Sequence, residues 1–164
     1  MAQKIAVNLC DAICSGELAE LPVGASETHV NQFLPAGDLT RWPDGVGFVY
    51  GDVGLIFVVV EGTRYLYHAE VNLAGSAKSA IKGGKVFDID ADFIRKGMRI
   101  YKFILSLIDR RIRFSFSPCA GETYLYIDVN NCSRVRFERI KGIYRITKIL
   151  LYFGDSGKVM PWDK

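Results

Sequence analysis

The amino-acid sequence predicts an α+β protein with a largely antiparallel sheet and helices packed on one side of that sheet. Strand-like runs of apolar residues follow one another closely, and short turn sequences separate them. Short connections favour antiparallel hairpins, because parallel neighbours need long crossovers. The chain has 164 residues, of which 49% are hydrophobic and 24% charged, so we expect a single soluble domain over residues 1–164.

Two helical segments are expected near the N-terminus. Apolar residues recur at a helical spacing in residues 2–15, where Ser-Gly ends the pattern. Ser26 is a typical N-cap for a second, shorter helix with an apolar stripe of Val30, Phe33 and Leu34. A connection rich in Pro, Gly and Asp then leads to the first strands.

Three strands are expected next. Residues 46–50 alternate between apolar and other side chains, as in a half-buried strand. Residues 55–60 are continuously apolar, which predicts a central strand buried on both faces. The alternation in residues 64–73 predicts a core-facing set of Tyr65, Tyr67, Ala69 and Val71.

The second half resembles the first in its order of elements. Residues 74–85 form a small, polar connection, and Asp88 or Asp90 is expected to cap a long helix. The predicted buried stripe of this helix contains Ile94, Gly97, Met98, Tyr101, Ile104, Leu105 and Ile108. Four strands are then expected, over residues 111–117, 123–129, 133–139 and 143–153. Residues 1–73 and 86–153 therefore read as two similar helix-plus-meander halves.

Charge divides unevenly along the chain. Residues 1–82 carry a net −4 and residues 83–164 a net +7. This asymmetry indicates an electropositive face for an acidic protein, a nucleic acid or a membrane surface, unless the two halves neutralise each other. The candidate partner-binding residues are Arg95, Arg99, Lys102, Arg111, Arg113, Arg134 and Arg136.

The candidate arginines of the strands allow two interpretations. If Arg111 and Arg113 lie beside Arg134 and Arg136 on one sheet face, four guanidinium groups could bind phosphates or carboxylates. Phe114, Phe116 and Phe137 are expected on the opposite face, which favours a protein partner over nucleic acid. The alternative is a solvated sheet face whose arginines pair across strands with Asp128 and Glu138.

Nothing in the sequence carries recognisable reaction chemistry. Cys10, Cys14, Cys119 and Cys132 lack the paired spacing of a zinc site, and burial explains most of them. A thiol nucleophile assisted by His29 or His68 remains a third, less favoured hypothesis. The triplet Asp88, Asp90 and Asp92 could hold a divalent cation, but helix capping explains it with fewer assumptions. We expect no enzyme activity, no cofactor and no metal.

One stretch resembles a known class of protein. It reads LPVGASETHVNQFLP, followed after a gap by GVGFVYGDVGLIFVVVEG, and spans Leu21 to Glu61. Its layout is similar to that of small bacterial proteins, several of which are immunity proteins of polymorphic or contact-dependent toxin systems. The resemblance implies inhibition of a cognate toxin domain by tight binding, without catalysis, but identifies no binding residue. The longest apolar run has six residues, too few to span a bilayer, so we expect a cytoplasmic protein with no membrane association.

Overall fold

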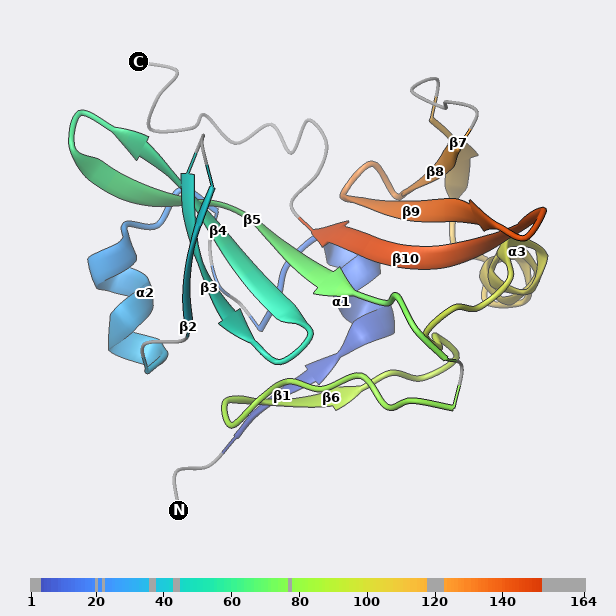
Figure 1. The fold of residues 1–164 in the computed structure, drawn as a ribbon, viewed down its shortest axis with the longest axis horizontal. Helices are drawn as coiled ribbons and strands as arrows, with labels where there is room; N and C mark the ends of the chain where they lie inside the picture. Colours follow the sequence, from blue (N-terminus) through green and yellow to red (C-terminus); the bar gives the residue numbers. More distant parts are fainter. Residues whose placement is uncertain are drawn as a thin grey trace.

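Within the residues that it describes, the computed structural model contains three helices and ten strands (Figure 1). These residues are 4–19, 21, 23–35, 38–42, 45–76, 78–117 and 123–151. In chain order, the elements are β1 (Ile5–Asn8), α1 (Leu9–Ser15), α2 (Glu27–Phe33), β2 (Asp38–Trp42), β3 (Gly45–Tyr50), β4 (Val53–Val60), β5 (Thr63–Asn72), β6 (Phe87–Asp90), α3 (Ile100–Asp109), β7 (Phe114–Phe116), β8 (Tyr124–Val129), β9 (Ser133–Ile140) and β10 (Ile143–Leu151).

Eight of the described strands form one antiparallel sheet, in the order β2-β3-β4-β5-β10-β9-β8-β7. The sheet consists of two four-stranded meanders, and the last strand of each meander joins them. β5 and β10 pair antiparallel, with Val71 opposite Ile149. β1 and β6 form a separate parallel pair. The predicted fold class, α+β with a largely antiparallel sheet, is confirmed.

The helices pack on one face of this sheet. Ser133 Oγ in β9 donates a 2.7 Å hydrogen bond to the carbonyl oxygen of Ile13 in α1. Phe103 of α3 packs against Phe137 of β9, with ring centroids 5.5 Å apart. α2 contributes Val30, which is fully buried. The opposite sheet face has no helix over it among the described elements.

The first helix begins later than the predicted range of 2–15. Residues 5–8 instead form β1, because they pair in parallel with β6, Ile5 lying opposite Phe87. The Asn8 side chain then accepts a 3.0 Å hydrogen bond from the backbone N–H of Asp11 and caps α1. The strand depends on a partner about 80 residues away, which local periodicity cannot reveal.

The predicted N-cap of the second helix is confirmed. Ser26 Oγ accepts a 3.2 Å hydrogen bond from the backbone N–H of His29. Val30 and Leu34 are buried as expected, but Phe33 is 60% exposed. Strand β2 was not predicted, because its residues were assigned to the connection before β3.

The prediction that β4 is buried on both faces is wrong. Leu55 and Phe57 are fully buried, whereas Ile56 and Val58, on the other face of the strand, are only half-buried. The apolar run reflects one helix-covered face and one face without a helix. The side chains of β4 on the face without a helix are therefore only partly shielded from solvent.

A β-bulge changes the predicted core face of β5. Ile56 of β4 lies opposite His68, and Phe57 lies opposite Leu66, so Tyr67 is an extra residue between them. Leu66 is consequently fully buried and Tyr67 is 49% exposed. Ala69 and Val71, beyond the bulge, are buried as predicted.

The long helix predicted after Asp88 or Asp90 is also shorter than expected. Both aspartates lie in β6, and α3 begins only at Ile100, with no side-chain hydrogen bond at its N-cap, Arg99. Gly97 lies before the helix with φ of +62°, and a Cβ there would come within 2.5 Å of the Gly75 carbonyl oxygen. The glycine permits this close approach.

The second meander largely follows the prediction. Strands β8, β9 and β10 match three predicted strands within a few residues. The strand predicted over 111–117 is confined to β7, because Arg111 has φ of +58° in the turn after α3. The predicted end of the last strand, beyond Leu151, lies outside the described residues.

A buried ion pair joins the first meander to the connection before α3. In the turn between β3 and β4, the Asp52 carboxylate lies 2.7 Å from Lys96 Nζ, and these side chains are 17% and 10% exposed. Its Oδ2 also accepts a 2.7 Å hydrogen bond from the backbone N–H of Lys82. Gly51 makes the approach possible, since a Cβ there would lie 2.5 Å from the Lys82 carbonyl oxygen. This contact fixes residues 82–96 against the sheet.

We predict that Lys96→Met lowers the free energy of unfolding by about 3 kcal/mol, because it leaves the mostly buried carboxylate of Asp52 unpaired. The matched control is Arg64→Met, which breaks the more exposed ion pair with Glu27. The control should cost no more than about 1 kcal/mol. Urea denaturation measures both variants, and equal losses would contradict a special role for Lys96.

Candidate partner-binding surface

The seven predicted basic residues separate into two groups. Arg134 and Arg136 lie on the sheet face opposite the helices. Arg134 binds the Asp128 carboxylate through two hydrogen bonds of 2.6 and 3.0 Å. Arg136 Nε donates a 3.2 Å hydrogen bond to Thr147 Oγ1. Both side chains are therefore engaged within the sheet, as the cross-strand interpretation expected for Arg134.

The four arginines of the strands do not form one row. Arg111 and Arg113 precede β7 rather than lying within it. Phe137 is buried on the helix-covered face, as predicted. Aromatic rings are nevertheless present on the arginine face, because the Arg134 guanidinium lies 5.8 Å from the ring centroid of Tyr126. A similar contact of 5.1 Å joins Arg136 and Tyr124.

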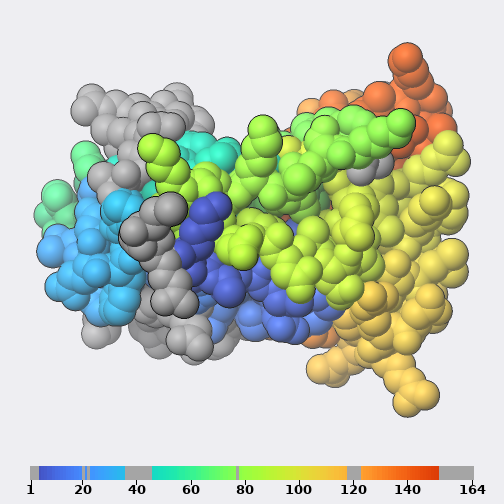
Figure 2. All heavy atoms as spheres, turned by 90° about the horizontal axis from the view of Figure 1, so that it is seen from below, coloured from blue at the N-terminus to red at the C-terminus, as the bar shows by residue number. Residues whose placement is uncertain are grey.

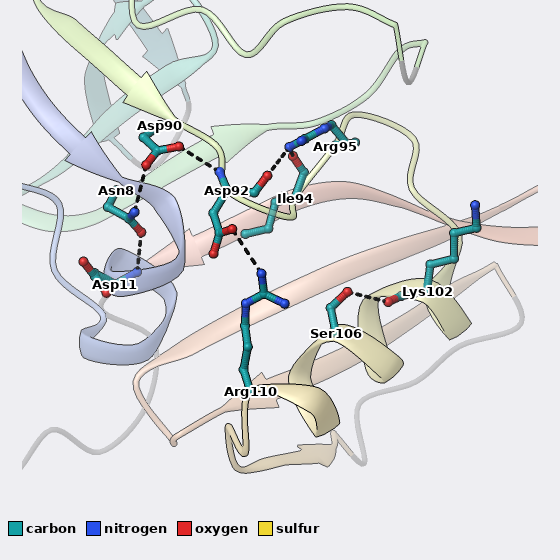
Figure 3. A network of polar contacts seen from close by, with 9 residues as sticks. All are labelled: Asn8, Asp11, Asp90, Asp92, Ile94, Arg95, Lys102, Ser106 and Arg110. Carbon is teal, nitrogen blue, oxygen red and sulfur yellow. Dashed lines mark hydrogen bonds and ion pairs between the residues drawn. The ribbon is translucent and has the colours of Figure 1, made fainter.

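Of the other five predicted residues, Lys102 lies within α3 and four lie in the segments before and after it, and all five are exposed. None has an acidic partner among the described residues. We call them the basic rim, which consists of Arg95, Arg99, Lys102, Arg111 and Arg113. Figure 3 shows the Lys102 amino group pointing away from the polar network around it.

Neighbouring cations behave differently from the basic rim. Arg110 lies 3.1 Å from Asp92 (Figure 3), and its guanidinium lies 4.3 Å from the ring centroid of Phe93. Lys96 pairs with Asp52. Arg95 donates hydrogen bonds to the backbone carbonyls of Asp92 and Ile94, so its position is fixed while its charge stays uncompensated. Structural ion pairs thus account for two cations of this region but not for the rim.

An apolar stripe on α3 is exposed beside the basic rim. Tyr101, Leu105 and Ile108 are 49%, 54% and 55% exposed, although the sequence predicted them on the buried side. Phe103 and Leu107 face the core instead. Seven of the ten residues of α3 are apolar and form one broad face, while Lys102, Ser106 and Asp109 share the other side, and the sheet covers only part of the apolar face. In the sequence, the signal for an exposed stripe was this apolar face, which is wider than a helix needs for packing on one sheet.

The edge strand β7, at the same end of the molecule as α3 (Figure 1), carries another exposed apolar residue. Phe116 of β7 lies opposite Ile127, which is buried on the helix-covered face. Phe116 is 58% exposed because no described strand or helix covers this edge. Figure 1 places α3 and β7 at the same end of the molecule, and in Figure 2 the yellow atoms of α3 form its right-hand end. We call the stripe, Phe116 and the basic rim together the α3 surface.

The described cysteines cluster near α1 without forming a catalytic pair. Burial raises the pKa of Cys10 to about 11, and the neighbouring Cys14 adds to the effect. Burial also raises the pKa of Cys14. No hydrogen bond joins Cys10, Cys14 or Cys132 to a histidine, and Cys119 lies outside the described residues. Raised pKa values leave less thiolate, the reactive form.

The aspartates predicted as helix caps organise a turn instead. Asp90 Oδ1 accepts a 3.0 Å hydrogen bond from the backbone N–H of Asp92, and its Oδ2 accepts one from Asn8 (Figure 3). Asp92 is engaged by Arg110. Among the described residues, no group of three His, Cys, Asp or Glu side chains could hold a metal ion.

Two hollows of the described surface contain basic side chains. One, of about 310 Å³, is lined mainly by isoleucine and alanine side chains, with Lys78 and Arg95 at its border. The other, of about 180 Å³, contains Arg113 and Asp128, but Asp128 is already bound by Arg134. Neither hollow is lined by a cysteine or a histidine.

Comparison with family models, curated proteins and solved structures found no match to this chain. Among the described helices, none has both the length and the apolar content required to cross a bilayer.

We predict that His68 makes the protein less stable in mild acid. Burial lowers the pKa of His68 from its ordinary value of 6.5, and nearby Lys148 acts in the same direction while Glu70 opposes it. The unfolded chain therefore binds a proton more readily, and stability falls as the pH drops below about 6.5, until the folded pKa is passed. His68→Gln should flatten this fall in urea titrations between about pH 5 and 7. His29→Gln, at an exposed position, is the control, and an identical effect of both variants would contradict the prediction.

We predict slow alkylation of Cys10 in the folded protein. Its pKa is raised from 9.0 to about 11, so at a given pH the thiolate fraction falls about a hundredfold. Iodoacetamide at pH ~8, followed by peptide mass spectrometry, should modify Cys10 far more slowly in the folded chain than in the same chain unfolded in urea. Equal rates in both states would show an accessible, activated thiol.

Proposed function

We propose that this protein is a non-enzymatic protein-binding module that acts through the α3 surface. The observation that carries the proposal is the exposed apolar stripe of Tyr101, Leu105 and Ile108, bordered by unpaired cations, with exposed Phe116 on the edge strand at the same end of the molecule (Figure 1). Six of the nine large hydrophobic side chains found exposed among the described residues lie between residues 101 and 143. Such concentration on a soluble domain is typical of an interaction site.

The composition of the α3 surface fits a protein interface. Protein interfaces have an apolar centre with aromatic residues and a polar, often arginine-containing rim. Covering the exposed halves of four large apolar side chains contributes roughly 3–5 kcal/mol, before the entropic costs of association. Unpaired cations around that centre add association rate and specificity toward an acidic partner.

In its sharpest form, the proposal is an immunity protein that neutralises a cognate bacterial toxin by tight binding in the cytoplasm. The resemblance over Leu21 to Glu61 supports this form. Raised thiol pKa values and hollows without histidine or cysteine support a role by binding rather than by thiol catalysis. An inhibitor of this kind needs a surface and no reactive group.

Nucleic-acid or phosphate binding is the second candidate, favoured by the basic rim. The arginines of the sheet face support it less, because Arg134 and Arg136 are hydrogen-bonded to neighbouring side chains. Tyr101 and Phe116 could stack with bases, but Leu105 and Ile108 of the same surface could not. Salt dependence separates the candidates, since nucleic-acid affinity falls steeply toward about 0.5 M salt and a packed protein interface persists.

We predict that the chain co-purifies with, and protects cells from, the variable C-terminal domain of a large secreted protein encoded next to it. Cells expressing that domain should survive when the wild-type chain is co-expressed. Alanine at each cysteine should preserve rescue, because the thiols are not used. Failure of the wild-type chain both to bind the domain and to rescue growth would overturn the immunity proposal.

A further inference from the structure

We infer that the α3 surface docks an acidic amphipathic helix of the partner protein, which lies beside α3 over the edge strand β7. The inference rests on the proposed protein-binding function and adds the chemistry and position of the occupant. Three features carry it: the direction of the apolar stripe, the uncovered edge of the sheet, and the sign of the unpaired charge.

The apolar stripe lies on the flank of α3 that is turned away from Phe93. Residues two apart on a helix point in directions that differ by about 200°. Phe103 contacts Phe93, with ring centroids 5.9 Å apart, and Arg110 lies over the same ring. Tyr101 is two residues before Phe103, and Ile108 is two residues before Arg110. Both therefore lie on the flank of α3 opposite to Phe93. That flank faces the free edge of the sheet.

Among the described elements, no helix lies beside α3 on this flank. Phe114 and Phe116 of β7 lie opposite Val129 and Ile127, so they share the sheet face on which α3 packs. Packed helices lie 8–10 Å apart, which is about the width of two strands. A partner helix in contact with α3 would consequently lie over β7. Its apolar side chains would cover Phe116 together with the stripe.

The length of the stripe suits a helix. Tyr101, Leu105 and Ile108 follow the i, i+4, i+7 spacing of one helix ridge. A second helix can pack its own ridge against such a row over about two turns. Recognition of an amphipathic helix by an apolar strip is a recurrent mode of binding.

The charge of the surface selects an acidic occupant. Residues 95–116 contain seven Lys or Arg and one acidic residue, Asp109. Two of these cations are paired within the protein, and the basic rim remains. A second copy of this chain would bring two basic rims together, so like-charge repulsion opposes a symmetric dimer through this surface. Glu or Asp on the polar side of a partner helix would instead neutralise the rim.

A protein fits the surface better than a membrane. An amphipathic helix that binds a bilayer lies flat at the outermost surface with its apolar side chains directed into the lipid. Here the stripe lies on the flank of α3 toward β7. Phe116 belongs to the edge strand of the sheet, which a partner bound to the stripe can also cover. Anionic vesicles therefore serve as a competing arm of the test.

The test uses a synthetic peptide of about 18 residues with Leu on one helical face and Glu on the other, a length that allows helix formation on binding. Fluorescence anisotropy with the full chain should give a dissociation constant on the order of 10–100 μM, as expected for an isolated segment. Leu105→Glu should weaken binding at least about tenfold. Phe33→Glu alters an equally exposed apolar residue on α2 and should change binding less than about twofold.

Two further arms test the charge and the class of occupant. The same peptide with Lys in place of Glu should not bind, because the basic rim repels it. Vesicles with about 30% anionic lipid and a single-stranded oligonucleotide should bind more weakly than the acidic peptide. Equal binding of both peptides, equal effects of the two variants, or preference for vesicles or oligonucleotide would overturn the inference.

Cell rescue separates this inference from the proposed function. If wild-type and Leu105→Glu chains both rescue cells from the toxin domain, the function stands and the docking surface is wrong. If the wild-type chain fails to rescue but the acidic peptide binds at α3, the surface stands without the immunity role. Thermal melting confirms that Leu105→Glu and Phe33→Glu remain folded.

Discussion

The limited helical cover of a wide sheet determines most of what is distinctive in this structure. Among the described residues, three helices of seven, seven and ten residues pack on a face that is eight strands wide. One helix covers about two strands, so short helices leave the margin of such a sheet uncovered. The uncovered margin is at β7, where Phe116 stays exposed and the outer flank of α3 meets solvent. The architecture itself therefore creates the apolar surface to which we assign partner binding.

The two meanders depend on contacts far apart in the sequence. β5 and β10 join them edge to edge, and the pair β1 and β6 connects the N-terminus to the segment before α3. The buried ion pair of Asp52 with Lys96 holds that same segment against the first meander. The segment held by this ion pair leads directly into α3, which packs over β9 at the far end of the sheet. The position of the α3 surface is thus fixed by core packing and does not depend on a flexible loop.

Features determined by local chemistry were predictable from the sequence. The Ser26 cap, the hairpins and three strands of the second meander follow from residue type and alternation. Features determined by distant pairing were not. β1 and β6 exist because they pair with each other, whereas local patterns assigned β1 to the first helix and interpreted Asp88 or Asp90 of β6 as the cap of the long helix. The bulge at Tyr67 likewise shifts a register that strict alternation cannot anticipate.

The candidate site shows the same division. The five cations of the basic rim were found from the sequence because arginine and lysine near a helix are visible without a fold. Arg134 and Arg136 belong elsewhere, since strand register brings Asp128 and Thr147 to them. The stripe was assigned to the buried side because the apolar face of α3 is wider than the core can cover, and tertiary packing alone decides which part of that face is buried. A helix with more apolar surface than its own sheet can cover leaves part of that surface exposed to solvent when no partner is bound. The cations around that remainder then restrict which partner can complete it, and this combination favours an acidic protein over a second copy of the chain.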